Sequence, residues 1–344
     1  MKEKEIIKEV KKIDRLYENI LSKGHEKRHR KKTHKYDCPE PFDRRTITTI
    51  LPKKVICIDE KLNWGNPPSS ILKAIDDGYN VINLGFYLDA GRGPSNMALI
   101  WKNFTKELRD ALLAYAHSKK AVIMVSVGGP TSTTIYTSNP EAFATEVTIF
   151  ANEYNLDGID YMLNRIETGF MYGSIKVIDW TKLLNNKSRE ILGSNKLLTH
   201  TPEALYFGQI GSTTSWAGTS GGYTSVYDNN KTIDWFNIQF YNKASSAYNI
   251  YTTLFNESDG YALGTSLTEI ASYGIPLEKL IVGKPLSPSN TANNGYITPN
   301  NLRNYFIQAQ NNLGWNAGVM FFQWNETHEP KIALDTIYPP ILKN

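Results

Sequence analysis

The residues of this chain that could carry chemistry are concentrated in the segment 156–164. The segment alternates apolar and polar positions, and Asp160, Met162 and Asn164 fall on one face, because side chains two residues apart in a strand point to the same side. A carboxylate at the last of these positions could act as a general acid. Asn164 has an amide there, which neither gains nor loses a proton at ordinary pH. We therefore expect a site that has the frame of an acid catalyst but lacks the acid.

The same segment resembles the fourth barrel strand of the family 18 glycoside hydrolases, which reads Asp-Gly-x-Asp-x-Asp-x-Glu. Asp157 and Asp160 occupy the first two acidic positions, whereas Met162 and Asn164 stand at the other two. Further segments are similar to other strands and loops of the short plant and fungal, hevamine-like (class III) chitinases. They are 122–129, 198–203, 234–242, 281–286, 295–299 and 318–322. The resemblance extends over residues 50–340 and implies a (β/α)8 TIM barrel.

The alternation of apolar runs with helical patterns supports the same fold class, α/β with a closed parallel barrel. A helix at 97–118 is expected to turn an apolar stripe toward the barrel. Eight strands are expected at 54–58, 80–87, 121–127, 156–163, 196–201, 235–241, 279–284 and 317–323.

The resemblance also implies a mechanism and its residues. In family 18 the Glu protonates the leaving oxygen, and the Asp two residues before it orients the substrate's own acetamido group, which attacks the anomeric carbon. By motif position Asn164 replaces the acid and Met162 replaces the orienting aspartate, so we expect no catalytic residue. Tyr241 corresponds to the tyrosine that contacts the acetamido group, and Phe322 to the floor of the sugar site. The implied ligand-binding residues are Asp160, Gln239, Tyr241, Asn242, Phe322 and Trp324.

Several of these residues have a plain structural interpretation as well. Asp160 could be a buried carboxylate that bonds to Ser126 or Tyr241. Glu203 could face the cleft, although no family role corresponds to it, and Glu167 would point to the other face of a continued strand. No cluster of His, Cys and Asp has the spacing of a metal site, and no glycine-rich phosphate loop occurs, so we expect neither a metal nor a cofactor.

Residues 1–45 are expected to form an N-terminal extension, with an amphipathic helix at 1–22 and a basic tract at 23–36, ahead of a barrel at 46–344. The net charge of +4 belongs to this extension, because the rest of the chain has slightly more acidic than basic residues. The helix could pack on its own barrel or dock on a protein partner. The tract lacks the interleaved aromatic residues that stack on bases, so we expect no specific nucleic-acid recognition. The apolar residues of the helix follow heptad spacing and are Ile6, Val10, Ile13, Tyr17 and Ile20.

The first residues are charged and contain no apolar segment typical of a secretory signal. No apolar run of about 18 residues predicts a membrane span. We therefore expect a location inside the cell or within an assembled particle. Cys57 lies in an apolar run and is expected to be a buried thiol.

Three functions remain open on these grounds. The first is a catalytically inactive chitinase-like barrel that serves as a structural or docking subunit of a larger assembly through residues 1–45. The second is a lectin-like binder of chitin or N-acetylglucosamine glycans that uses the cleft around Tyr241. The third is a glycoside hydrolase with a relocated acid. General acid catalysis contributes about 10²–10⁴-fold, so the loss of the acid and of its orienting partner argues against the third.

Overall fold

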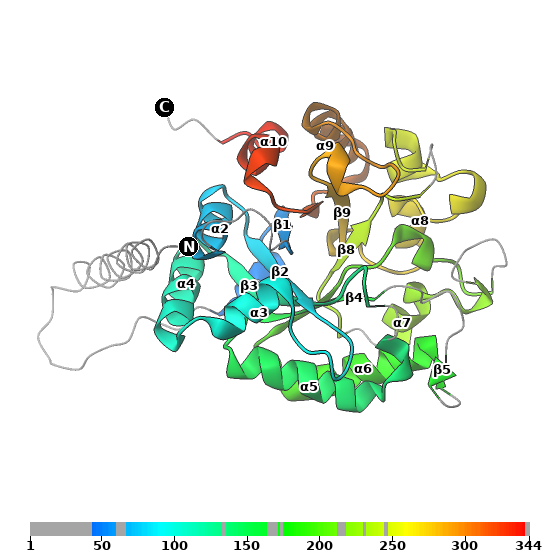
Figure 1. Ribbon diagram of the computed structural model, residues 1–344. Helices are drawn as coiled ribbons and strands as arrows, with labels where there is room; N and C mark the ends of the chain where they lie inside the picture. The colour runs from blue at the N-terminus through cyan, green and yellow to red at the C-terminus, as the bar shows by residue number, and fades with distance from the viewer. Residues whose placement is uncertain are drawn as a thin grey trace, which may run out of the picture.

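Eight parallel strands close into one barrel, and helices surround it (Figure 1). The order around the barrel is β1-β10-β9-β8-β7-β4-β3-β2. Every strand predicted from the sequence agrees with an observed strand within two residues at each end. The observed strands are β1 (Lys53–Ile58), β2 (Val81–Tyr87), β3 (Val122–Gly128), β4 (Gly158–Met162), β7 (Leu197–His200), β8 (Phe236–Gln239), β9 (Leu280–Pro285) and β10 (Gly318–Phe322). The computed structural model describes residues 43–59, 67–132, 135–163, 171–172, 175–211, 218–229, 232–243 and 247–340. The predicted (β/α)8 fold is confirmed.

The helices cover the outside of the barrel. The single helix predicted at 97–118 is wrong: the chain forms two helices there, interrupted at Phe104 and Thr105, which both have extended backbones. Thr105 begins the second helix because its hydroxyl accepts a hydrogen bond from the Leu108 N–H at 3.2 Å. The helices are α2 (Pro67–Asp76), α3 (Asn96–Asn103), α4 (Lys106–Ser118), α5 (Pro140–Glu153), α6 (Val177–Leu192), α7 (Tyr223–Asn229), α8 (Leu267–Ser272), α9 (Pro299–Leu313) and α10 (Pro330–Ile337), with a small hairpin of β5 (Met171–Tyr172) and β6 (Ile175–Lys176).

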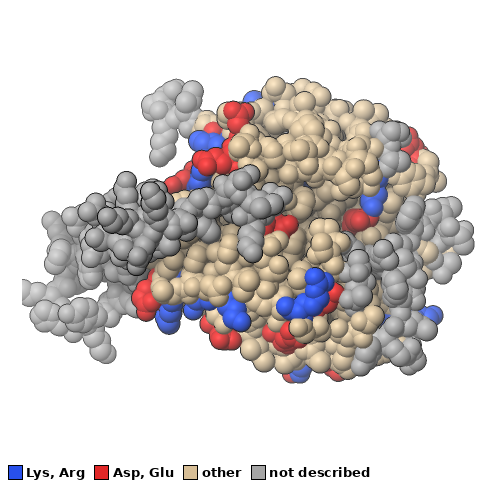
Figure 2. Space-filling view, in the orientation of Figure 1, with Lys and Arg blue, Asp and Glu red and all other residues tan. Residues whose placement is uncertain are grey.

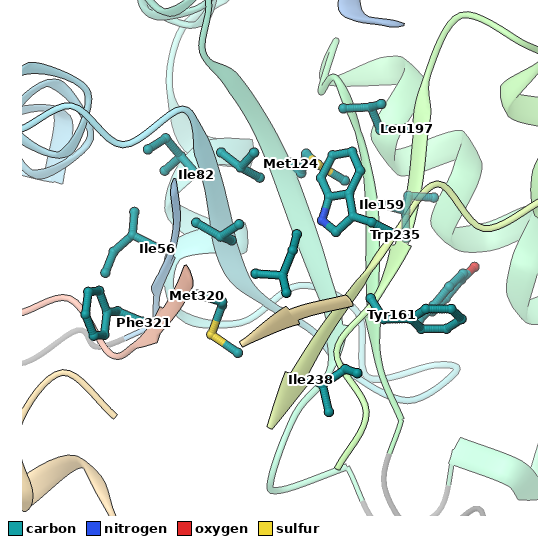
Figure 3. Close-up of a cluster of buried hydrophobic side chains, with 14 of the residues drawn as sticks. Ile56, Ile82, Met124, Ile159, Tyr161, Leu197, Trp235, Ile238, Met320 and Phe321 are labelled. Carbon is teal, nitrogen blue, oxygen red and sulfur yellow. The ribbon is translucent and has the colours of Figure 1, made fainter. Parts of the chain in front are cut away.

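Buried apolar side chains fill the barrel and the layer between strands and helices, and Figure 3 shows part of this cluster. Near the N-terminal ends of the strands, the Lys53 ammonium donates to the carbonyls of Thr48 at 3.1 Å and Ile50 at 2.7 Å. The same ammonium lies 5.3 Å from the centre of the Trp235 ring. Burial lowers the pKa of Lys53 to about 8. This end of the barrel is therefore packed, and backbone carbonyls and the Trp235 ring surround the Lys53 ammonium.

A short 3-10 helix, η1 (Arg44–Thr49), is attached to the N-terminal ends of two strands. The Arg44 guanidinium bonds to Asp157, which directly precedes β4, and Arg45 donates to Asp234, which precedes β8, at 2.6 Å. Arg189 from α6 also donates to Asp234, at 3.1 Å. The last residues assigned to the extension are thus part of the base of the barrel. The predicted helix at 1–22 and the basic tract lie outside the described residues.

The part of the chain that the structure describes contains no helix long and apolar enough to cross a membrane. The predicted burial of Cys57 is confirmed, and its thiol is free. On the face drawn in Figure 2, the charged side chains of the described residues occur in small groups that include both signs.

Candidate ligand site at the barrel mouth

Asp160 lies fully buried inside the barrel and joins four strands. Its carboxylate accepts hydrogen bonds from Ser126 at 3.0 Å, Thr199 at 2.7 Å, Thr201 at 2.8 Å and the Asn237 amide at 3.1 Å. Burial raises the pKa of Asp160, and the hydrogen bonds from the hydroxyl groups and the amide partly offset that rise. The donors come from β3, from β7 with the residue after it, and from β8. Asp160 is therefore a structural centre of the upper barrel.

Of the two partners expected for Asp160 from the sequence, Ser126 is confirmed. No hydrogen bond joins Asp160 to Tyr241 among the residues that the structure places. The register explains the difference, because Ser126 pairs with Asp160 across β3 and β4. Tyr241 follows β8 by two residues and lies higher, at the mouth.

Met162 ends β4 and faces the mouth of the barrel, as its register predicts. Its side chain is only 4% exposed and packs with Cys57 and Phe86, with Phe322 at the edge of the group. The position that holds an aspartate in the family 18 motif is thus occupied by a thioether in apolar surroundings. Asn164 and Glu167, which the sequence analysis weighed, lie outside the described residues.

Tyr241 and Phe322 form an aromatic pair at the mouth. Their ring centres are 6.4 Å apart and the ring planes differ by 17°. Burial raises the pKa of Tyr241 well above its usual value, and the nearby Cys57 and Glu203 raise it further, so the hydroxyl is a neutral hydrogen-bond group. Phe322 is only partly buried, whereas Trp324 is buried in the main hydrophobic core. Of the two residues expected as a platform, Phe322 is therefore the more accessible.

The loop after β9 covers Tyr241, and Asn242 holds this loop in place. Gly295 has a φ of +111°, and a Cβ at that position would overlap with Tyr241. Asn242 accepts a hydrogen bond from the Ala292 N–H at 2.8 Å, and its own N–H donates to the Asn294 carbonyl at 2.8 Å. The side-chain oxygen of Asn242 thus holds the loop, and its expected contact with a ligand beside Tyr241 stays a prediction.

Gln239 lies at the level below Tyr241, and its amide donates to the Thr201 carbonyl at 2.8 Å. Beside it, Glu203 and Lys243 form an ion pair that sequence reasoning missed, since Lys243 was not singled out. The signal was available in principle: Glu203 follows β7, Lys243 follows β8, and these strands are neighbours. A carboxylate and an ammonium group at adjacent strand ends can meet at the same edge of the mouth.

The model of the glycosyl hydrolases family 18 matches residues 63–332. The chain belongs to this family. Endochitinase 37 of Trichoderma harzianum is 28% identical to it over 251 residues, which cover 65% of this chain and 69% of that protein. Family 18 membership agrees with the motif segments found on β3, β4 and β8.

Several solved structures share the fold. A GH18 chitinase from Pseudoalteromonas aurantia superposes with a TM-score of 0.63 at 20% identity, covering 83% of this chain and 99% of that chain. A xylanase and alpha-amylase inhibitor protein from Scadoxus multiflorus superposes with a TM-score of 0.56 at 18% identity, covering 84% of this chain and 98% of that chain. At these identities the likeness establishes the architecture alone. Among the described residues, no group of three or more His, Cys, Asp or Glu side chains could hold a metal ion.

Proposed function

We propose that this chain is a non-catalytic member of family 18 that binds a chitin or N-acetylglucosamine oligosaccharide at the mouth of its barrel. The observation that carries the proposal is Met162, packed against Cys57 and Phe86 where the family motif has the orienting aspartate. A thioether cannot accept the acetamido N–H strongly or stabilise the positive charge that develops during substrate-assisted hydrolysis. Asn164, at the position of the acid, cannot protonate a leaving group.

Two uncharged groups at the mouth of the barrel support sugar binding. Tyr241 offers a neutral hydroxyl, and Phe322 offers a partly exposed ring next to it. Aromatic faces and a few placed polar groups are the usual composition of a small-molecule site. Its relatives include proteins named as chitinases, and one structural neighbour is named as an inhibitor protein. A family 18 barrel that binds without cleaving is consistent with both.

The proposal is tested by measuring hydrolysis and binding of the same chitin tetrasaccharide. We expect no turnover above the buffer rate, together with a heat of binding in calorimetry that Tyr241→Phe reduces. The double change Met162→Asp with Asn164→Glu should bring back slow hydrolysis. Turnover by the unaltered protein that Glu203→Gln abolishes would instead support a relocated acid. Absence of both turnover and binding would contradict the proposed binding of a chitin oligosaccharide.

A second candidate is the docking subunit, in which the N-terminal extension joins a larger assembly. It is favoured by the position of η1: Arg44 and Arg45 bind at the base of the barrel, opposite the mouth, so a partner held through residues 1–42 would leave the mouth free. The expected location within an assembled particle belongs to this candidate.

The docking candidate is tested by comparing the full chain with a chain that starts at residue 43. Light scattering after size exclusion should report a loss of assembly in the shortened chain while its thermal unfolding stays unchanged. A chain that starts at residue 46 lacks both arginines and should unfold at a lower temperature. Unchanged assembly of the shortened chain would contradict the docking role.

A further inference from the structure

The Glu203–Lys243 ion pair lies on the β7 and β8 side of the mouth. Glu203 forms a parallel bridge with Gln239, and the Gln239 N–H donates to the Pro202 carbonyl at 2.8 Å, which fixes the chain just before Glu203. Lys243 follows Asn242, whose φ of +61° and bonds to the loop after β9 fix the chain there. Both members of the pair are thus held on a rigid edge of the mouth.

Both charged side chains are only partly buried, with 21% of Glu203 and 15% of Lys243 exposed. The Lys243 ammonium also lies 6.0 Å from the centre of the Tyr206 ring, which forms the wall behind it. A pair of this kind gains little net stability, because desolvation and side-chain ordering offset most of the attraction. Its place at the mouth therefore calls for an explanation other than stability.

The surroundings of the pair are aromatic and lie toward the expected sugar site. Lys243 is two residues from Tyr241, and the Glu203 charge is close enough to raise the pKa values of Tyr241, Tyr248 and Tyr261, although burial is the larger cause in each. The partly exposed charge pair thus lies near Tyr241 at the mouth.

We propose that Glu203 and Lys243 form a specificity-determining subsite that binds the hydroxyl groups of a neutral sugar residue next to the one at Tyr241. This inference rests on the proposed binding of an oligosaccharide at the mouth. The carboxylate accepts hydrogen bonds and the ammonium donates them, whereas neighbouring sugar hydroxyls do both. Hydrogen bonds to charged partners are stronger than those between neutral groups.

The pair selects neutral sugars because it presents one negative and one positive charge to the ligand. An anionic sugar would meet the Glu203 carboxylate, and a cationic glucosamine unit would meet the Lys243 ammonium, each at a cost that the neutral N-acetylated unit avoids. Removing one partner leaves the other charge exposed to the ligand. Single substitutions should therefore shift the preference in opposite directions, which a merely structural pair would not do.

The test compares calorimetric affinities for the tetramer of N-acetylglucosamine and for the fully deacetylated tetramer of glucosamine. Relative to the unaltered protein, Lys243→Met should shift the affinity ratio about 10-fold toward the cationic tetramer, and Glu203→Gln should shift it away. The double variant Glu203→Gln with Lys243→Met should bind the neutral tetramer about 10-fold more weakly without a change in preference. Asp110→Asn, which breaks the exposed Lys106–Asp110 pair on α4, is the matched control and should change neither affinity.

The outcomes separate this inference from the proposed function. Tetramer binding that depends on Tyr241 but keeps its preference in both single variants would overturn the subsite and leave the proposed function standing. Failure of the unaltered protein to bind either tetramer would overturn both. Thermal unfolding of each variant establishes that it is folded, and the double variant leaves no unpaired charge if a single change reduces stability.

Discussion

The base and the mouth of the barrel differ in what they hold of the segment 156–164. At the base, Asp157 is fully buried and binds Arg44, His117 and the Ile123 N–H. At the mouth, Met162 sits in an apolar group and has no charged partner in the described structure. Both residues belong to the segment that resembles the family's catalytic strand. The acidic positions that this chain keeps are those whose carboxylates hold the fold together.

The difference teaches which positions can change without loss of the barrel. Asp157 connects η1, α4 and β3, and Asp160 connects β3, β7 and β8. A carboxylate at position 162 would serve a bound sugar and would add nothing comparable to the packing. A barrel that no longer cleaves sugar can therefore place a methionine there, whereas replacement of either retained aspartate would leave buried donors without an acceptor.

The largest effect is expected at the base. Asp157→Ala would leave the Arg44 guanidinium and the Ile123 N–H without their acceptor, so we expect a loss of about 3–5 kcal/mol in the free energy of unfolding. Urea unfolding followed by circular dichroism measures it. Asp110→Asn, at an exposed pair on α4, should cost no more than about 0.5 kcal/mol. A loss below about 1 kcal/mol for Asp157→Ala would refute the view that the base depends on this carboxylate.

The next effect concerns the carboxylate inside the barrel. Asp160→Ala removes the acceptor of three hydroxyl groups and the Asn237 amide, and we expect a loss of about 2–4 kcal/mol. Asp160→Asn keeps the shape and one carbonyl oxygen, and the hydroxyl groups can rotate to accept from its amide. It should cost clearly less than Asp160→Ala in the same unfolding experiment. Equal losses for the two variants would mean that the negative charge, rather than the hydrogen-bond network, is required.

A third effect is a pH dependence from Lys284, which is fully buried in β9. Its ammonium donates to the carbonyls of Phe240 at 2.6 Å and Tyr248 at 2.9 Å, and burial lowers its pKa to about 7. Between pH 7 and about 10 the unfolded chain holds a proton that the folded chain has released, so Lys284 makes stability rise with pH. The slope it adds is at most about 1.4 kcal/mol per pH unit.

Lys284→Met should remove this part of the slope when unfolding is measured from pH 7 to 9.5. Burial also lowers the pKa values of Lys53 and Lys196 to about 8 each, so part of the rise should remain. Lys331→Met, at an exposed position of α10, is the control. The Asp335 hydrogen bond raises the pKa of Lys331, so this lysine stays charged throughout the range and the slope should not change. An unchanged slope in Lys284→Met would show that burial does not lower the pKa of this lysine.

The strands could be predicted from the sequence because each is a short apolar run between polar turns, and buried parallel strands have that pattern. The helix at 97–118 could not be divided correctly, since Phe104 continues the apolar stripe across the break. The cap at Thr105 is a local signal that outweighs the stripe. Helix periodicity therefore located the element but not its interruption.

The site was harder to predict, since its contacts join residues far apart in the chain. Strand alternation places Met162 and Asp160 on the inner face, but it does not say which hydroxyl groups of β7 reach Asp160. The role of Asn242 depends on a left-handed backbone and on a loop about 50 residues later. The Lys243–Glu203 pair depends on two loops that meet only because β7 and β8 are neighbours.

The smallest effect is expected at the mouth, where Met162→Leu exchanges two apolar side chains of similar volume. Such exchanges usually cost less than about 1.5 kcal/mol, and sugar binding should stay unchanged if Met162 serves only to fill the space beside Cys57 and Phe86. Met162→Asp is the informative counterpart. It buries a second carboxylate two residues from Asp160 without an arginine of the kind that stabilises Asp157 at the base, so it should cost more than Met162→Leu. A stable Met162→Asp variant would show that the mouth still accommodates the charge of the family motif, and the contrast between the two ends of the barrel would then lie in Asn164 alone.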